Sequence, residues 1–208
     1  MEANDKKMID LTLGDFSDLL ASNAPAPGGG AVAALSGATG VALIMMVANL
    51  TVGKKRYAEY EEENQEALTA CAPLLEGMKA GIDEDKDAFT LVSNAYAMSK
   101  ETDEEKQARK DAIAEASVGA AEAPLRVIRQ AAEAIVICRN LIGRSNPNLV
   151  SDLYVAALEL QAATSAALMN VEANLPSIRD EELRARFEEE AKEGSETVER
   201  LAAEILNR

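Results

Sequence analysis

The pattern of apolar and polar residues along the chain has a helical period almost throughout. Apolar residues recur at spacings of three and four, and prolines, glycines and capping residues interrupt the pattern. We expect Pro73 to kink one helix, Gly81 to end it, and the segment between Gly119 and Pro124 to interrupt a longer helix. The pattern predicts an all-α multihelical bundle in which residues 1–208 form a single domain. The expected helices span about residues 13–22, 31–51, 57–79, 83–98, 102–142, 148–174 and 180–206.

The segment 31–50 differs from the other helical segments because it contains no charged residue. Its length is that of a membrane span, so an anchored helix is one interpretation. Its apolar residues are largely alanine, however, and the other segments are amphipathic, which favours a buried, glycine- and alanine-rich central helix without a membrane. Small residues at Ala33, Gly37 and Gly40 would allow neighbouring helices to approach closely, within the chain or across a dimer.

The net charge of the chain limits the kinds of partner that it is expected to bind. The net charge is -15, which argues against general binding to nucleic acid or to an anionic membrane. The run Lys54, Lys55 and Arg56 is a local exception and follows the charge-free segment directly. It either holds an anionic ligand or complements the negative end of a helix dipole, and both roles are compatible.

The chain contains no histidine, which excludes Ser-His triads and His-ligated zinc. Acid or base chemistry must therefore use Asp, Glu, Lys, Tyr or Cys. Cys71 and Cys138 lack metal-site spacing and are expected to be buried free thiols. Together with a charged N-terminus that lacks the apolar core of a signal peptide, they favour a cytoplasmic protein.

The acidic runs 61–63 and 188–190 are weak candidates for a metal site. Consecutive residues on a helix point about 100° apart and cannot converge on one ion. We interpret both runs as solvated faces and expect no metal site.

A glycine-rich loop precedes the charge-free segment. Pro27 is followed by Gly28, Gly29 and Gly30, and a helix is expected to begin directly after them. Glycines allow backbone N–H groups to approach a ligand closely, and a helix start presents unpaired N–H donors. The loop is therefore a candidate binding element.

One carboxylate occupies a position where the pattern requires an apolar residue. Ile82, Asp85, Phe89, Val92 and Tyr96 form a stripe at spacings of three and four that is expected to face the core. An aspartate in such a stripe is either paired or has a raised pKa that suits proton transfer. The alternative is an acid in a first helical turn that balances the helix dipole. We expect Asp85 to be catalytic.

Two amides continue another apolar stripe. Asn170 and Asn174 come directly after a stripe of apolar residues that is expected to be buried. The two asparagines are one helical turn apart, so both are predicted to lie on the face of that stripe. Asparagine offers a donor and an acceptor, as the amide and amine edge of a heterocyclic ligand requires. Both side chains could instead bond to neighbouring helix ends. The stripe that they continue consists of Leu153, Ala156, Leu160, Ala163 and Ala167.

Three further candidates lie apart from these residues. Ser151 and Asp152 stand near the start of the helix that carries the asparagines, and 18 residues separate Asp152 from Asn170, or about 27 Å along a helix. They form either a local cap or part of a site completed by another subunit. Lys100 lies in a turn before the capping box of Thr102 and Glu105 and is a further binding candidate.

Several short strings, in this order, give the chain a resemblance to a known family. It resembles the cyclodeaminase/cyclohydrolase family of tetrahydrofolate one-carbon enzymes over nearly its whole length. The strings that carry the resemblance are PAPGGG (25–30), LTVGKKRY (50–57), DKDAF (85–89), KETDEEK (100–106), SD (151–152) and NVEANL (170–175).

The resemblance implies an interlocked homodimer that acts on folate-borne one-carbon units without a metal or redox cofactor. It implies that Asp85 stabilises a cationic substrate or deprotonates water. It further implies that the glycine loop presents backbone N–H groups to a carboxylate or a pterin oxygen, and that Lys54, Lys55 and Arg56 hold the anionic, possibly polyglutamylated, tail. These roles extend the expectations drawn from the residues.

Two enzyme activities and one binding role are compatible with these expectations. We favour a methenyltetrahydrofolate cyclohydrolase because no formiminotransferase segment accompanies the domain. The alternative enzyme is a formiminotetrahydrofolate cyclodeaminase, which releases ammonia. A noncatalytic helical folate-binding or assembly protein is the third possibility.

Overall fold

The structure is a computed structural model that describes residues 7–207, and in this range the chain is helical with no strand. The all-α prediction is therefore confirmed. The α-helices are α1 (Leu13–Leu20), α2 (Gly29–Asn49), α3 (Glu61–Ala97), α4 (Asp103–Leu141), α5 (Val150–Asn174) and α6 (Glu181–Leu206). The short 3-10 helices are η1 (Met8–Asp10), η2 (Lys55–Tyr60), η3 (Pro147–Leu149) and η4 (Leu175–Ser177).

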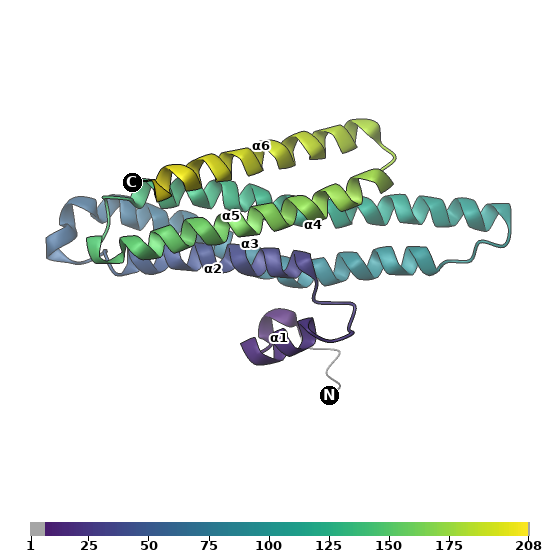
Figure 1. Ribbon diagram of the computed structural model, residues 1–208, viewed down its shortest axis with the longest axis horizontal. Coiled ribbons are helices and arrows are strands. Elements are labelled where there is room, and N and C mark those ends of the chain that lie inside the picture. The colour runs from purple at the N-terminus through teal and green to yellow at the C-terminus, as the bar shows by residue number, and fades with distance from the viewer. Residues whose placement is uncertain (1–6, 208) are drawn as a thin grey trace.

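The long helices α2 to α5 run lengthwise through an elongated bundle, and α6 lies along α4 and α5 (Figure 1). Helix α2 packs against α3 on one side and α5 on the other. Close packing depends on small residues: a Cβ at Gly40 would stand 3.1 Å from the backbone oxygen of Ala156, and one at Gly37 would stand 2.5 Å from Sδ of Met78. Small residues on α2 therefore allow the neighbouring helices to pack at short range.

Helix α2 is long and apolar enough to cross a membrane by length and composition, with a mean hydropathy of 2.1. Within the bundle, 56% of an apolar 18-residue stretch of this helix is buried. Protein neighbours therefore cover about half of a helix that carries no charge, and a strip of it remains exposed.

Two predicted helix boundaries are wrong. Helix α3 continues without a break from Glu61 to Ala97 through Pro73 and Gly81, and α4 continues through Gly119 and Pro124. Pro73 lies on the exposed side of α3, and a Cβ at Gly81 would stand 3.3 Å from Cβ of Ala34 in α2. Packing against neighbouring helices outweighs the local preference of these residues to end a helix, which is about 1 kcal/mol for glycine and about 3 kcal/mol for proline.

The C-terminal part of α3 and the N-terminal part of α4 form an arm that extends past the other long helices (Figure 1). On this arm Phe89 and Tyr96 are 46% and 52% exposed. The prediction that their stripe faces the core is wrong for these two aromatic residues, because α3 reaches the ends of α2 and α5 near Phe89 and extends past them at Tyr96. The stripe that precedes the asparagines on α5 is fully buried, as predicted.

Local signals at other places are confirmed. Thr102 and Glu105 form the predicted capping box at the start of α4. Cys71 and Cys138 are free and buried, and burial raises the pKa of these thiols to about 11 and about 12. In the acidic run 188–190 one residue departs from the prediction of a solvated face: Glu190 is half-buried and accepts two hydrogen bonds from Arg129 of α4, at 2.6 and 2.8 Å.

Candidate functional site

The first turn of α2 is capped by a side chain from another helix. Gly28 precedes α2 and makes no side-chain cap. The carboxylate of Asp85 in α3 takes this role, because the N–H of Ala31 donates to its Oδ2 atom at 3.0 Å. Unpaired N–H groups at a helix start carry partial positive charge, which stabilises a carboxylate there. The start of α2 therefore fixes the position of Asp85.

The environment of Asp85 shifts its acidity. Burial raises the pKa of the Asp85 carboxyl above its ordinary value, and the hydrogen bond from Ala31 opposes this shift only in part. A carboxylate with a raised pKa is a stronger proton acceptor than an exposed one and is suited to general-base chemistry.

The glycine-rich loop approaches Asp85 closely at one position. A Cβ at Gly30 would stand 2.0 Å from Oδ1 of Asp85, which is too short for any non-bonded contact. A Cβ at Gly28 would stand 3.9 Å from Oδ2, an ordinary contact distance, and Pro27 before it is buried. The position of the Asp85 carboxylate therefore requires a residue without a side chain at Gly30.

Asp85 borders a small cavity of about 120 Å³ that also reaches the asparagines of α5. The amide of Asn170 lies against the loop, since a Cβ at Gly29 would stand 3.6 Å from its Nδ2 atom. Nδ2 of Asn170 donates to the oxygen of Ala166 at 2.8 Å, one turn back in α5. The cavity is lined by Asp85, Ala88, Phe89, Val92, Ala120, Asn170 and Asn174.

The structure thus brings Asp85, Asn170 and Asn174 to one place beside the glycine loop. These residues come from α3 and α5, and 85 positions separate Asp85 from Asn170 in the chain. Each was predicted separately from an interrupted apolar stripe. Their convergence is a result of the tertiary structure.

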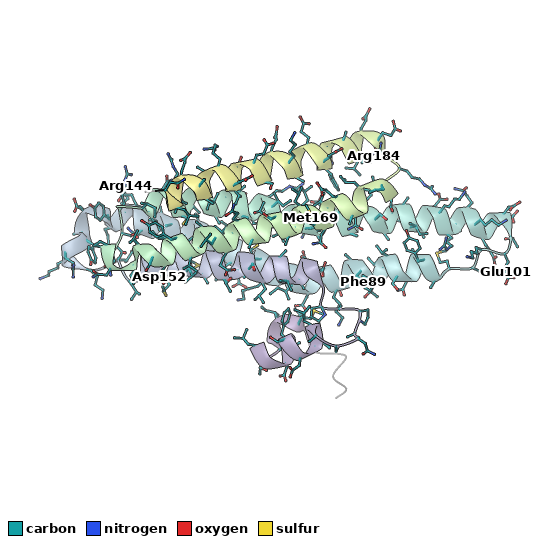
Figure 2. The ribbon with its side chains drawn as sticks, viewed as in Figure 1. Phe89, Glu101, Arg144, Asp152, Met169 and Arg184 are labelled. Atoms are coloured by element: carbon teal, nitrogen blue, oxygen red, sulfur yellow. The ribbon has the colours of Figure 1, made fainter. Side chains whose placement is uncertain are left out.

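The predicted cationic residues lie at the opposite end of α2. The helix begins at Gly29 and has 21 residues, so Lys54 and Lys55 stand about 31 Å or more from the glycine loop. Ser151 and Asp152 begin α5 at the same end as the lysines, whereas the asparagines end it. Figure 2 places Asp152 near one end of the molecule and Phe89 well along α3 toward the other.

A second and larger cleft is present at that opposite end. Its volume is about 370 Å³, and Arg56 and Tyr60 are among the residues that line it. Two hydrogen bonds hold its wall together: the hydroxyl of Tyr57 donates to Oδ1 of Asn146 at 2.7 Å, and the N–H of Asn146 donates to Oγ1 of Thr51 at 3.0 Å. The cleft joins η2 to η3 and lies next to the lysines.

Lys100 is near neither the cavity at Asp85 nor the lysines at the opposite end of α2. It lies exposed in the turn at the tip of the arm, and 12 residues of helix separate Asp85 from Ala97, or about 18 Å. Within one chain, the predicted site residues therefore fall into three separate places.

Sequence reasoning assigned no role in the site to four residues that border the cavity, namely Ala88, Phe89, Val92 and Ala120. Phe89 and Val92 were recognised as members of the stripe that contains Asp85, and Phe89 is 46% exposed beside the cavity. Ala120 carries no signal of its own, although Pro124 follows it four residues later in α4.

The site offers one carboxylate, two amides and an apolar wall. Within residues 7–207, no group of three or more His, Cys, Asp or Glu side chains is placed to hold a metal ion. The arrangement suits a flat heterocycle: the amides can pair with its polar edge, and Asp85 can face a positively charged or water-accepting carbon.

Comparison with known proteins identifies the family of the chain. The family model described as formiminotransferase-cyclodeaminase matches residues 12–193. A methenyltetrahydrofolate cyclohydrolase of Methylorubrum extorquens is 42% identical over 182 residues, which cover 88% of this chain and 86% of that protein.

Two further relatives are cyclodeaminases by name. A formimidoyltransferase-cyclodeaminase of Gallus gallus is 30% identical over 93% of this chain, which spans 37% of that longer protein. The crystal structure of a formiminotetrahydrofolate cyclodeaminase from Thermotoga maritima superposes with a TM-score of 0.84 at 32% identity and covers 94% of both chains.

The family match spans most of the chain, and the relatives agree in sequence and in fold. The resemblance inferred from the short motifs is therefore confirmed. This chain belongs to the formiminotransferase-cyclodeaminase family.

Proposed function

We propose that this protein is a methenyltetrahydrofolate cyclohydrolase, and that Asp85 is its catalytic acid/base. The observation that carries the proposal is a half-buried carboxylate with a raised pKa, held by a helix start beside two amides in one cavity. The relative of that name is 42% identical over most of both chains, which supports this choice between the two enzyme activities.

The proposed chemistry is the addition of water to a cation. Methenyltetrahydrofolate contains an amidinium carbon between two nitrogens, and a carboxylate next to it stabilises the positive charge. Asp85 accepts a proton as the oxygen of water bonds to that carbon. The hydroxyl of the adduct releases its remaining proton to solvent as the bond from the carbon to one nitrogen breaks. This nitrogen takes up the proton held by Asp85, so formyltetrahydrofolate forms and one proton is released. No electron is transferred in this reaction, so it needs no redox cofactor.

The amides of Asn170 and Asn174 are proposed to orient the pterin. Its cyclic amide and amine present both donors and acceptors, which asparagine can match. The N–H groups at the glycine loop add donors at the start of α2. These contacts would hold the reacting carbon beside Asp85.

One chain forms only part of the proposed site. The cavity at Asp85 measures about 120 Å³, whereas pockets for ligands of drug size have volumes of about 300–1,000 Å³. A reduced folate with its benzoyl and glutamate groups is larger than this cavity. The cations suited to the glutamate carboxylates lie at the other end of α2.

A second copy of the chain is proposed to complete the site. Two uncharged stripes at helical spacing lie at the surface on the adjoining helices α2 and α5. The hydroxyl of Thr39 in one stripe contacts Glu159, which is next to Leu158 in the other, at 3.4 Å. The stripes are Val32, Leu35, Thr39, Ala42, Met46 and Leu50 on α2, and Ser151, Val155, Leu158, Ala162, Ser165 and Met169 on α5.

The chemistry of this surface favours a like partner. We name the two stripes together the α2/α5 face. The chain has a net charge of -15, and none of the residues in the stripes is charged. The face is about 27 Å long and about 20 Å wide, so each copy would bury on the order of 500 Å² there, and the exposed apolar residues of the arm would add to it. A partner on this face would complete the burial of α2.

A two-fold axis perpendicular to the helices would place opposite ends of the two copies together. The partner subunit's Lys54 and Lys55 would then approach Asp85, and Ser151 and Asp152 would approach Asn170 in the same way. The lysines are proposed to bind the glutamate carboxylates of the folate, including those of polyglutamylated forms.

The test is the decay of methenyltetrahydrofolate absorbance with purified protein, corrected for spontaneous hydrolysis, together with an ammonia assay on formiminotetrahydrofolate. Enzyme-dependent decay without ammonia release supports the proposed function. Ammonia release with negligible decay would instead assign cyclodeaminase activity. Absence of both activities would refute the enzyme proposal and favour a noncatalytic folate-binding role.

The cyclodeaminase is retained as the second candidate because of the structural neighbour of that name, which matches 94% of the chain. In that reaction a folate nitrogen attacks the formimino carbon and ammonia leaves after proton transfer. Asp85 would again serve as the acid/base, so the same site geometry supports either activity.

A further inference from the structure

A proline in the middle of α4 releases a backbone oxygen beside the proposed site. Pro124 has no N–H group, so the oxygen of Ala120, four residues earlier, cannot receive the hydrogen bond that a regular α-helix supplies. Ala120 is half-buried and lines the cavity that contains Asp85, Asn170 and Asn174. An oxygen without its helical partner is therefore placed where a ligand would bind.

Asn174 donates one weak hydrogen bond to this oxygen, which can accept a second. Its Nδ2 atom donates to the oxygen of Ala120 at 3.3 Å, which is a long bond, and to the oxygen of Asn170 at 2.8 Å. A carbonyl oxygen has two lone pairs, and a 3.3 Å contact engages one of them weakly. A second lone pair on the same oxygen can accept a hydrogen bond from a donor in the cavity.

The other proline inside a helix provides an internal comparison. Pro73 of α3 also lacks an N–H group, and it leaves the oxygen of Thr69 without its helical partner. Pro73 and Thr69 are both exposed, and neither lines a described cavity near Asp85. Water can satisfy the oxygen there, so a helical proline by itself does not indicate a site.

We propose that the Ala120 oxygen is a hydrogen-bond acceptor for the substrate, that it takes an N–H of the pterin, and that Pro124 is the positioning residue that releases it. This inference rests on the proposed function for the identity of the ligand. The amine and ring N–H groups of a pterin are donors, while the nearby amides already donate within the protein. An additional acceptor therefore complements the ligand.

The test compares Pro124→Ala with Pro73→Ala in the full chain. Each substitution restores a helical N–H to one oxygen, and each removes a helix-interior proline, so both variants should remain folded. Kinetics with methenyltetrahydrofolate and the calorimetric Kd for tetrahydrofolate are measured for both variants and the native protein. Tetrahydrofolate retains the pterin donors and is not turned over.

We expect Pro124→Ala to raise KM and the Kd about tenfold, the loss that follows from one hydrogen bond, with kcat and the pH profile unchanged. Pro73→Ala should match the native protein. Unchanged KM and Kd in Pro124→Ala would overturn the inference. A lower kcat with a displaced pH profile would also overturn it, because Pro124 would then act through Asp85, whose other side it borders.

The outcomes separate this inference from the proposed function. A native protein that binds tetrahydrofolate but hydrolyses no methenyltetrahydrofolate refutes the activity, and the Kd comparison still decides the role of the Ala120 oxygen. A native protein that binds no folate refutes both.

Discussion

Asp85 of α3 accepts a hydrogen bond from the backbone N–H of Ala31 at 3.0 Å and so caps a helix to which it does not belong. The same carboxylate borders the cavity that holds the two amides of α5. One side chain therefore connects the start of α2 with the site, and its structural and chemical roles can be separated by substitution.

Asp85→Asn should abolish turnover while the fold remains. The amide oxygen of asparagine can still accept from Ala31, but it cannot accept a proton at neutral pH, so kcat should fall by about 10²- to 10⁴-fold. Steady-state kinetics and circular dichroism measure the two effects. Asp87→Asn, on an exposed position two residues later, is the matched control and should keep native rates. Native kinetics in Asp85→Asn would remove Asp85 from the mechanism.

The stability of Asp85→Asn relative to the native protein should depend on pH. Burial raises the pKa of Asp85 in the folded state above that in the unfolded state. Stability from this group is therefore fully present below the unfolded pKa and is lost as pH rises through the folded pKa. The Tm of the variant minus that of the native protein should increase from pH 3 to pH 7. A difference that stays constant over this range would show that the carboxyl is not perturbed.

Gly30→Ala should damage the site although alanine favours helices. The added Cβ would stand 2.0 Å from Oδ1 of Asp85 and must displace the carboxylate. We expect at least a tenfold loss of kcat and about 1–3 kcal/mol of destabilisation. Gly119→Ala, at an exposed helical position with open space around it, should instead add about 1 kcal/mol of stability with native kinetics. Equal behaviour of the two variants would contradict the close approach at Gly30.

Ala162→Arg should separate the proposed dimer. Ala162 is exposed in the middle of the α5 stripe, and a pair of like charges buried between two copies is strongly unfavourable. Sedimentation should show the native protein at twice the 22.1 kDa chain mass and the variant at one chain mass with reduced activity. The control Ala203→Arg introduces the same charge on the exposed side of α6 and should remain dimeric. A native monomer, or a dimeric Ala162→Arg, would rule out this interface.

Mixed dimers should reveal whether two subunits share one site. Asp85→Asn and the double variant Lys54→Ala/Lys55→Ala are each expected to have low enzyme activity at low substrate concentration. Their co-expression produces dimers in which one site is native and the other carries all the substitutions. Activity at low substrate should then reach about a quarter of the native value, because half of the dimers are mixed and each has one intact site. A value equal to the mean of the two parents would place all these residues in one subunit.

The amino-acid sequence determined the elements and several of the polar positions. A period of three and four identified the helices, and the interruptions of that period at Asp85, Asn170 and Asn174 identified polar groups that do not fit an apolar face. The capping box at Thr102 was also correctly predicted, because a cap depends on residues within one turn. The family resemblance followed from short strings in a fixed order, and comparison with known proteins confirms it.

The packing of the helices against one another sets which of these residues meet and which are exposed. Local preference placed a helix end near Gly81, but packing against α2 keeps α3 continuous there. The same pattern placed Phe89 and Tyr96 in the core, yet they are exposed because α3 extends beyond its neighbours. The period of a helix specifies a face, whereas the partner of that face depends on the lengths and packing of other helices. For this reason Asp85, the start of α2 and the freed oxygen of Ala120 form one site that the sequence by itself did not assemble.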